Sequence, residues 1–164
     1  MKALLDLLER KGISEVKVND ILDESKIARG TFYRYHKTKE DLMEATICYY
    51  ASLLDDEIQK DLIEEPTKET MQDFIRFIII HKMEYRNLNR LFPCSSLNNL
   101  QDALEKDREE KGYDRTMDCL YSLFLDEIEN ETDPTEESLK DRLRRLLEER
   151  NQEMILIKKV LDHA

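Results

Sequence analysis

Apolar residues recur at intervals of three and four positions through most of this chain, which is the spacing of one face of an α-helix. Only three Gly and three Pro interrupt the 164 residues, so few positions favour a tight turn. No segment alternates apolar and polar residues with the period of two that marks a half-buried strand. Hydrophobic residues make up 40% of the chain, enough for a core. The sequence therefore predicts an all-α protein with short loops.

Helix caps and breaks divide the chain into a series of predicted helices. Thr38 and Thr67 each precede a long apolar-periodic run and can act as N-caps, and Ser95 or Ser96 can cap a later helix. Residues 105–111 are almost wholly charged, so we expect them to project into solvent. The predicted helices cover residues 3–11, 18–25, 29–35, 39 to 61 or 62, 67 onward, 85–92, 95 or 96 to 111, 113–129 and 135–162.

Residues 26–39 concentrate positive charge in an otherwise acidic chain. The whole chain holds 26 Lys and Arg against 37 Asp and Glu, a formal net charge of −11. The stretch 26–39 holds five Lys or Arg, one His and two Tyr, with no acid. Basic side chains, aromatic rings and small hydrogen-bonding groups in one short segment are typical of a surface that contacts a phosphate backbone. The sequence therefore predicts a nucleic-acid interface here.

Two short predicted helices meet at the start of this stretch. The helix over 18–25 ends near Ser25, a break follows, and the helix over 29–35 begins at Arg29. Two short helices joined by a tight break form a helix-turn-helix, whose second helix enters the major groove of DNA. We therefore expect residues 29–35 to form a reading helix.

A resemblance to a known family rests on four segments: Glu-Arg-Lys-Gly at 9–12, Val-Asn-Asp-Ile at 18–21, Arg-Gly-Thr-Phe-Tyr-Arg-Tyr at 29–35 and Lys-Glu-Asp-Leu at 39–42. Over about the first 45 residues the chain resembles the DNA-binding domain of the TetR family of bacterial repressors. The resemblance implies a three-helix helix-turn-helix domain over 1–41 and a helical effector and dimerisation domain over 42–164. It also implies a repressor that binds a palindromic operator in double-stranded DNA as a homodimer and is released by a small-molecule effector.

The residue types in the reading helix suit contact with DNA. Gly30 lets the backbone approach without a Cβ in the way, and Thr31 offers a hydroxyl to phosphate and a methyl group to thymine. Arg29 can reach a guanine edge or a phosphate, and the sequence leaves this choice open. Lys39 can bind a phosphate beside the free N–H groups of the next helix. The predicted DNA-binding residues are Arg29, Gly30, Thr31, Tyr33, Arg34, Tyr35, Lys37 and Lys39.

Other side chains of this region are expected to serve the structure. Phe32 should point away from DNA, into a small core with Leu7, Ile21 and Leu42. His36 is expected to pack or cap and not to read a base.

Three positions depart from the pattern of the family. The turn position that is usually Gly is Lys26, where a left-handed backbone would cost about 1 kcal/mol. The usual Ser or Thr caps of the second and third helices are replaced by Lys17 and Ala28, and each missing cap costs about 1 kcal/mol. We therefore expect this helix-turn-helix to be weakly stabilised by local interactions.

The resemblance implies two features of the C-terminal domain. One is a dimer surface formed by the last two helices, about 113–130 and 135–162, whose apolar stripes could form a four-helix bundle with the partner's copies. The alternative is that these stripes bury against their own domain. The other is a small-molecule site, for which ordinary core packing is the alternative. Its candidate lining residues are Tyr49, Phe74, Phe77, Ile78, His81 and Tyr85.

Other classes of function find less support. The chain shows no nucleophile–base set, Gly-rich phosphate loop or His/Cys cluster, so we expect no enzymatic activity, no metal and no cofactor. An alternative function is a helical protein-interaction module of this fold that recruits a partner protein. No apolar run is long enough to span a membrane, and acids interrupt the N-terminal apolar run where a signal peptide would be uncharged. We therefore expect a cytoplasmic protein.

Three cysteines, Cys48, Cys94 and Cys119, lie far apart in the sequence and lack the spacing of a metal site. We expect free thiols, as is usual in a reducing compartment. A redox sensor is the alternative.

Overall fold

The computed structural model describes residues 1–64, 67–113, 141 and 145. All regular structure in these residues is helical, so the predicted all-α class is confirmed for them. The predicted helices that begin at 113 and 135 fall almost wholly outside the described residues, as does Cys119. The elements are α1 (Lys2–Leu8), α2 (Val18–Ser25), α3 (Arg29–Tyr35), α4 (Lys39–Ile58), a π-helical segment (Gln59–Glu64), α5 (Lys68–Leu88), a 3-10 turn (Phe92–Cys94) and α6 (Leu100–Lys111).

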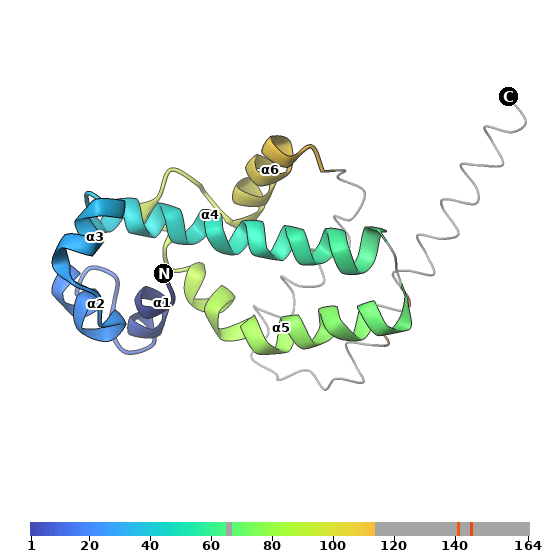
Figure 1. The fold of residues 1–164 in the computed structure, drawn as a ribbon, viewed down its shortest axis with the longest axis horizontal. Helices are drawn as coiled ribbons and strands as arrows, with labels where there is room; N and C mark the ends of the chain where they lie inside the picture. Colours follow the sequence, from blue (N-terminus) through green and yellow to red (C-terminus); the bar gives the residue numbers. More distant parts are fainter. Residues whose placement is uncertain (65–66, 114–140, 142–144, 146–164) are drawn as a thin grey trace, which may run out of the picture.

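The long helix α4 is the axis around which the others are arranged (Figure 1). Helices α1, α2 and α3 gather at its N-terminal end, α5 runs back alongside it, and α6 packs on it from another side. A single hydrophobic cluster runs from Leu4 in α1 to Leu104 in α6. The three short N-terminal helices are therefore continuous, through their core, with the longer helices behind them.

Helix α4 forms because both its start and its apolar face are well specified. Thr38 Oγ1 accepts a hydrogen bond from the Asp41 N–H at 3.1 Å, and Asp41 Oδ2 accepts from the Thr38 N–H at 3.1 Å. This capping box satisfies two backbone donors that a helix start leaves unpaired, so the predicted Thr38 cap is confirmed. The buried apolar residues of α4 are Leu42, Met43, Ile47, Tyr50, Ala51, Leu54 and Ile58.

Both ends of helix α1 form polar contacts with α5 or the residues just after it. The Lys2 ammonium lies 3.1 Å from the Glu84 carboxylate. The Arg90 guanidinium, just after α5, donates a hydrogen bond to the Leu8 carbonyl at the last turn of α1. The last carbonyls of a helix have no partner within the helix, so Arg90 supplies one from another element. Helix α1 ends at Leu8, three residues earlier than predicted.

The prediction of a separate helix over 85–92 is wrong. Helix α5, capped by Thr67 as expected, continues unbroken to Leu88, and a short 3-10 turn follows at Phe92–Cys94. No Gly or Pro lies between Thr67 and Leu88 to end the helix, and the buried residues Phe74, Ile78 and Tyr85 lie on one continuous face.

The predicted caps of the next helix are also wrong. Asn99, and neither Ser95 nor Ser96, caps α6, and its side chain accepts a hydrogen bond from the Asp102 N–H at 3.0 Å. Ser96 Oγ instead donates to the Glu44 carboxylate of α4 at 2.6 Å. Both Ser and Asn can cap a helix, but Ser96 is engaged by α4 and the Ser95 hydroxyl by the carbonyls of Phe92 and Leu97, which leaves Asn99 as the cap.

The expectation that residues 105–111 project into solvent is wrong for one residue that matters to packing. Arg108 is 5% exposed and its Nε donates to the Asp55 carboxylate of α4 at 2.8 Å. Burial raises the pKa of Asp55, while the hydrogen bond and charge of Arg108 oppose that rise. The second oxygen, Asp55 Oδ2, is buried and finds no hydrogen-bond partner in the described part of the chain. The charged half of α6 is therefore held on α4 by a buried ion pair.

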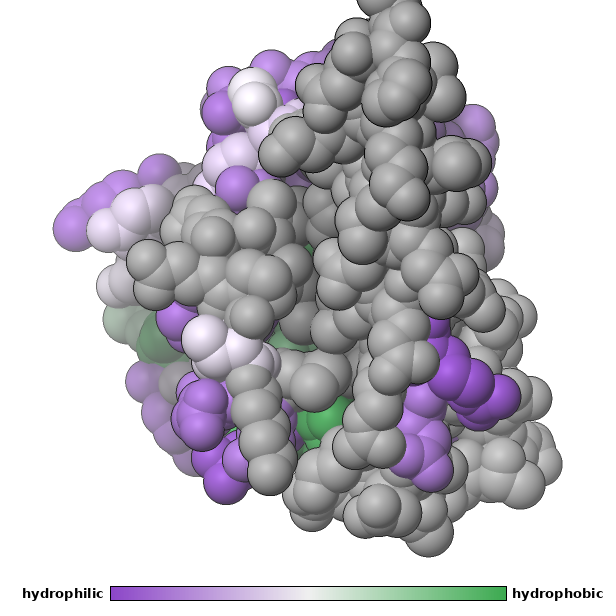
Figure 2. Space-filling view, turned by 90° about the vertical axis from the view of Figure 1, so that its right-hand side faces the viewer, coloured by the Kyte–Doolittle hydropathy of each residue, from purple (hydrophilic) through white to green (hydrophobic). Residues whose placement is uncertain are grey.

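Figure 2 views the end of α4 and α5 remote from α1–α3, and most of the coloured residues on this side are hydrophilic, with hydrophobic colour in a few places. The described surface is not wholly polar, because Ile79, Ile80 and Met83 of α5 are exposed. Among the described helices, none combines the length and apolar character needed to cross a membrane.

The Asp55–Arg108 pair gives a prediction for stability. Arg108→Met should lower the free energy of unfolding by about 3 kcal/mol near pH 7, because the Asp55 charge is left buried without its partner. The folded-state pKa of Asp55 is raised, so this cost is absent below the unfolded pKa of about 4 and grows as the pH rises. Urea unfolding at several pH values measures it. Lys106→Met, an exposed cation on the same helix, is the control. A double variant with Asp55→Leu should recover most of the loss.

Candidate nucleic-acid interface

Helices α2 and α3 have the boundaries predicted for a helix-turn-helix, Val18–Ser25 and Arg29–Tyr35. The turn between them passes through Lys26, which has φ 58° and ψ 24°. This is the left-handed region that favours glycine, because a Cβ crowds the backbone there. Among the described residues Lys26 is the one non-glycine residue with positive φ. The predicted strain at this turn position is therefore present.

Both helices start without a side-chain cap at the N-cap position. Lys17 precedes α2 and Ala28 precedes α3, and neither side chain accepts a hydrogen bond there. In α2 the Asp20 carboxylate compensates in part, because it accepts from the Lys17 N–H at 2.8 Å. That hydrogen bond, with a second from Lys11, lowers the pKa of Asp20. Helix α3 has no such substitute among its own residues.

Helix α3 divides into a buried side and an exposed side. Phe32 is 1% exposed and belongs to the same core as Leu7, Ile21 and Leu42, as predicted. Around it, Thr31, Tyr33, Arg34 and Tyr35 are exposed, with Tyr35 leaving 73% of its surface open. One large apolar side chain therefore anchors a seven-residue helix and turns its polar and aromatic residues outward.

Contacts between aromatic rings support the exposed side of α3. The Tyr33 ring meets the Phe32 ring edge to face, with centroids 5.2 Å apart. The His36 ring lies 5.7 Å from Phe32, and the His36 N–H donates to the Phe32 carbonyl at 2.9 Å. His36 thus packs and ends the helix, as expected.

The cations of this region differ in their surroundings. Arg34 and Lys37 are exposed, and neither pairs with an acid among the residues that the structure describes. Arg29 donates to the Asn19 side chain of α2. Asn19 stands in the motif at 18–21, but its contact with Arg29 depends on how α2 and α3 cross, so the sequence alone does not reveal this role.

Lys39 is engaged within the protein. Its Nζ donates to the carbonyl oxygens of Ile13 and Val16, each at 3.0 Å, and the side chain is half-buried. Gly30, by contrast, faces open space: a Cβ built on it would have no atom within 4 Å. Among the described residues outside this helix, none therefore requires glycine at position 30.

The six candidate ligand residues are only partly brought together. The Phe77 ring lies 4.7 Å from that of His81, 6.3 Å from Phe74 and 6.2 Å from Tyr85. Tyr49, in contrast, is half exposed. Tyr85 Oη donates to the Tyr50 carbonyl at 2.6 Å, and burial raises the pKa of Tyr85 well above its usual value. Ile78 is buried in the same core.

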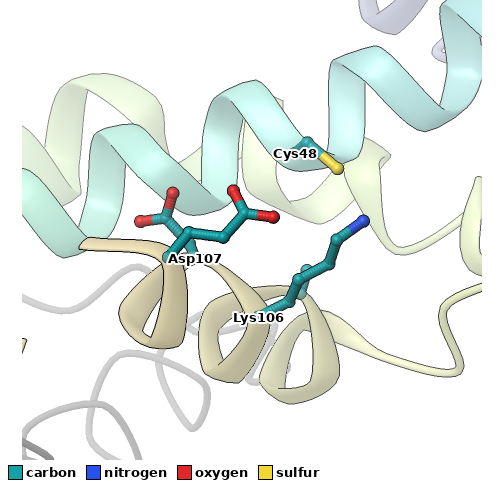
Figure 3. A pocket seen from close by; sticks show the side chains of 5 residues that line it. Cys48, Lys106 and Asp107 are labelled. Atoms are coloured by element: carbon teal, nitrogen blue, oxygen red, sulfur yellow. The ribbon is translucent and has the colours of Figure 1, made fainter. Parts of the chain in front are cut away.

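Two hollows lie elsewhere. An open one of about 310 Å³ between α1 and α2 is lined mainly by charged residues, among them Arg10, Asp20 and Lys26. A smaller one of about 70 Å³ lies between α4 and α6, where Lys106 extends toward Cys48 (Figure 3). Burial raises the pKa of the Cys48 thiol against the opposing charge of Lys106. Cys48 and Cys94 are both free thiols.

Comparison with known proteins gives two matches to this region. The family model described as "Bacterial regulatory proteins, tetR family" matches residues 1–46. Residues 1–46 are a tetR-family domain. The transcriptional regulator AcuR of Cereibacter sphaeroides is 41% identical over 59 residues, which are 34% of this chain and 27% of that protein. No solved structure matches the chain significantly.

The tetR-family domain covers α1, α2, α3 and the first turns of α4. The resemblance seen over about the first 45 residues is therefore confirmed in both its extent and its family. The chain spans only 27% of the length of AcuR, so the likeness concerns about a third of this chain and no more. Helices α5 and α6 lie beyond the match to the family model.

The strained turn of the tetR-family domain gives a second prediction. Lys26→Gly should raise the free energy of unfolding by about 0.5–1 kcal/mol, since glycine adopts the left-handed region without a Cβ penalty. Thermal or urea unfolding measures the change. Lys26→Ala is the matched control, because it removes the same charge but keeps the Cβ. Equal stability of the two variants would show that the left-handed backbone carries no cost.

Proposed function

We propose that this protein is a DNA-binding transcriptional regulator that presents α3 to the major groove of duplex DNA. The observation that carries the proposal is the two-sided character of α3 within a tetR-family domain. Its one buried residue is Phe32, and its outward side is aromatic, basic and free of acids. The name of the matched relative, a transcriptional regulator, supports the same class of function.

Each exposed group suits a part of DNA. The phenol groups of Tyr33 and Tyr35 can donate to phosphate oxygens, and Arg34 and Lys37 add positive charge that is not neutralised by described acids. Thr31 offers a hydroxyl and a methyl group to a base edge. Gly30 allows the backbone to come close. The negative charge of the rest of the chain disfavours binding in other orientations.

A single helix-turn-helix reads only a few base pairs, so we further propose a homodimer on a palindromic operator, acting as a repressor. The apolar stripes of the sequence over 113–130 and 135–162 support a dimer surface there. Sedimentation equilibrium at micromolar concentration tests this part, and the expected mass is twice 19.6 kDa. A monomer under these conditions would exclude it. Such a regulator would act in the cytoplasm, where bacterial DNA lies.

The proposed release by a small-molecule effector rests on the cluster around Phe77. His81 Nδ1 is buried beside this ring with no hydrogen-bond partner among the described residues, so it is a polar atom that a bound molecule could satisfy. The second candidate function is a protein-interaction module of the same fold. Such a module would bind a partner protein, and it would show no steeply salt-dependent binding to duplex DNA.

Binding to a duplex enriched from a randomised pool tests the proposed function. The logarithm of the association constant should fall linearly with the logarithm of salt concentration, with about −0.9 in slope for each phosphate contacted. Tyr33→Ala should weaken binding by about tenfold, or about 1.4 kcal/mol, while leaving the protein folded because the Tyr33 side chain is exposed.

Gly30→Ala sharpens this experiment. The added methyl group meets no protein atom, so the variant should be as stable as wild type, or more stable by about 0.5–1 kcal/mol through helix propensity. It should nevertheless bind the duplex more weakly if the backbone of α3 approaches DNA closely. Unchanged affinity in both variants would show that α3 is not the reading helix.

A further inference from the structure

The Lys39 ammonium lies in an unusual place for the basic stretch 26–39. It is half-buried and donates to two backbone carbonyls, those of Ile13 and Val16, both at 3.0 Å. Lys37, two residues earlier, carries the same side chain but is exposed. Charged donors form stronger hydrogen bonds than neutral ones, so these two contacts are substantial ties between distant parts of the chain.

The ties join the two ends of the helix-turn-helix. Val16 stands just before α2, and Lys39 is the first residue of α4, just after α3. The bond from Lys39 to Val16 therefore closes the segment 17–38 into a loop that contains both helices. Asp41 stabilises the same junction at the start of α4. Its carboxylate accepts hydrogen bonds from the backbone N–H groups of Lys37, at 2.9 Å, and Thr38.

Helix α3 needs such restraints from outside. It has seven residues, no side-chain cap at Ala28 and a strained turn at Lys26, and a helix this short is marginal by itself. Phe32 fixes which side of α3 is buried. A tie between the two ends of the unit can fix how far α2 and α3 turn relative to α4.

We propose that Lys39 is a positioning residue that ties the start of α2 to the start of α4 and so sets the angle at which α3 meets DNA, without itself binding a phosphate. This inference rests on the proposed function. It separates two lysines that look equivalent in the sequence: Lys37 faces the nucleic acid, and Lys39 holds the unit that presents it.

Matched variants, Lys39→Met and Lys37→Met, test this proposal by their salt dependence. Lys39→Met should bind the enriched duplex about tenfold more weakly with the salt slope of wild type, because no phosphate contact is lost. Lys37→Met should lower the magnitude of the slope by about 0.9. Circular dichroism first establishes that each variant is folded at the temperature used. A folded Lys39→Met with unchanged affinity, or with a slope reduced like that of Lys37→Met, would overturn the proposal.

A second measurement needs no DNA. Amide hydrogen exchange over residues 12–17 should quicken in Lys39→Met and stay at the wild-type rate in Lys37→Met. Only the former releases the chain at Ile13 and Val16, and so loosens the hydrogen-bonded amides of Glu15 and Lys17 beside them. Equal exchange in wild type and both variants would refute the structural role of Lys39, whether or not the protein binds DNA. Failure of wild type to bind DNA would instead refute the proposed function. Lys39→Arg keeps the charge but alters the donor geometry. It should lose affinity as Lys39→Met does, and full retention would favour a phosphate contact.

Discussion

Burial of the apolar face of α4 is the constraint on which the other helices depend. Met43, Ile47 and Leu54 on this face are almost without exposure, and each such side chain contributes about 1.5–3 kcal/mol when removed from water. Helices α5 and α6 pack on α4, while α1, α2 and α3 gather at its N-terminal end. Helix α4 therefore links the two groups of helices: its buried residues share one core with Leu4 and Phe32, and Lys39 at its start reaches the segment before α2.

The unit formed by α2 and α3 is held mainly by contacts from other elements. Ala28 leaves α3 without a cap, and Lys26 strains the turn before it. The compensating interactions come from other elements: Phe32 in the shared core, Arg29 on Asn19, and Lys39 on the connection before α2. Tertiary contacts thus stabilise a motif whose local signals are weak, which is how short helices in proteins usually persist.

Charge has two distinct uses in the described part of the molecule. On α3 and just after it, Arg34 and Lys37 remain exposed, as suits electrostatic attraction of a polyanion. Between α4 and α6, Asp55 and Arg108 are buried together. Removing two charges from water costs several kcal/mol that the pair only partly regains, so this contact specifies how α6 lies on α4 more than it adds stability.

Helices with clear local signals could be predicted from the sequence alone. Periodicity, the Thr38 cap and the motif at 29–35 predicted α2, α3 and the start of α4 with the observed boundaries, and predicted that Phe32 would be buried. Competing local signals were not resolved in this way: α5 continues past residue 85, and Asn99 caps α6 in place of Ser95 or Ser96. A cap is decided by which backbone groups lie within reach, and sequence shows only which side chains could serve.

The roles of charged side chains, in contrast, depend on how the helices pack in three dimensions. In the sequence, Lys37 and Lys39 belong to one basic stretch, and Arg108 to one charged run. In the fold, Lys39 reaches carbonyls 23 and 26 residues away, and Arg108 reaches a carboxylate 53 residues away. The partner of a long, flexible side chain is the group that helix packing places within reach of its charged end. Local sequence patterns carry no information about that partner, whereas the burial of an apolar residue follows directly from its periodicity.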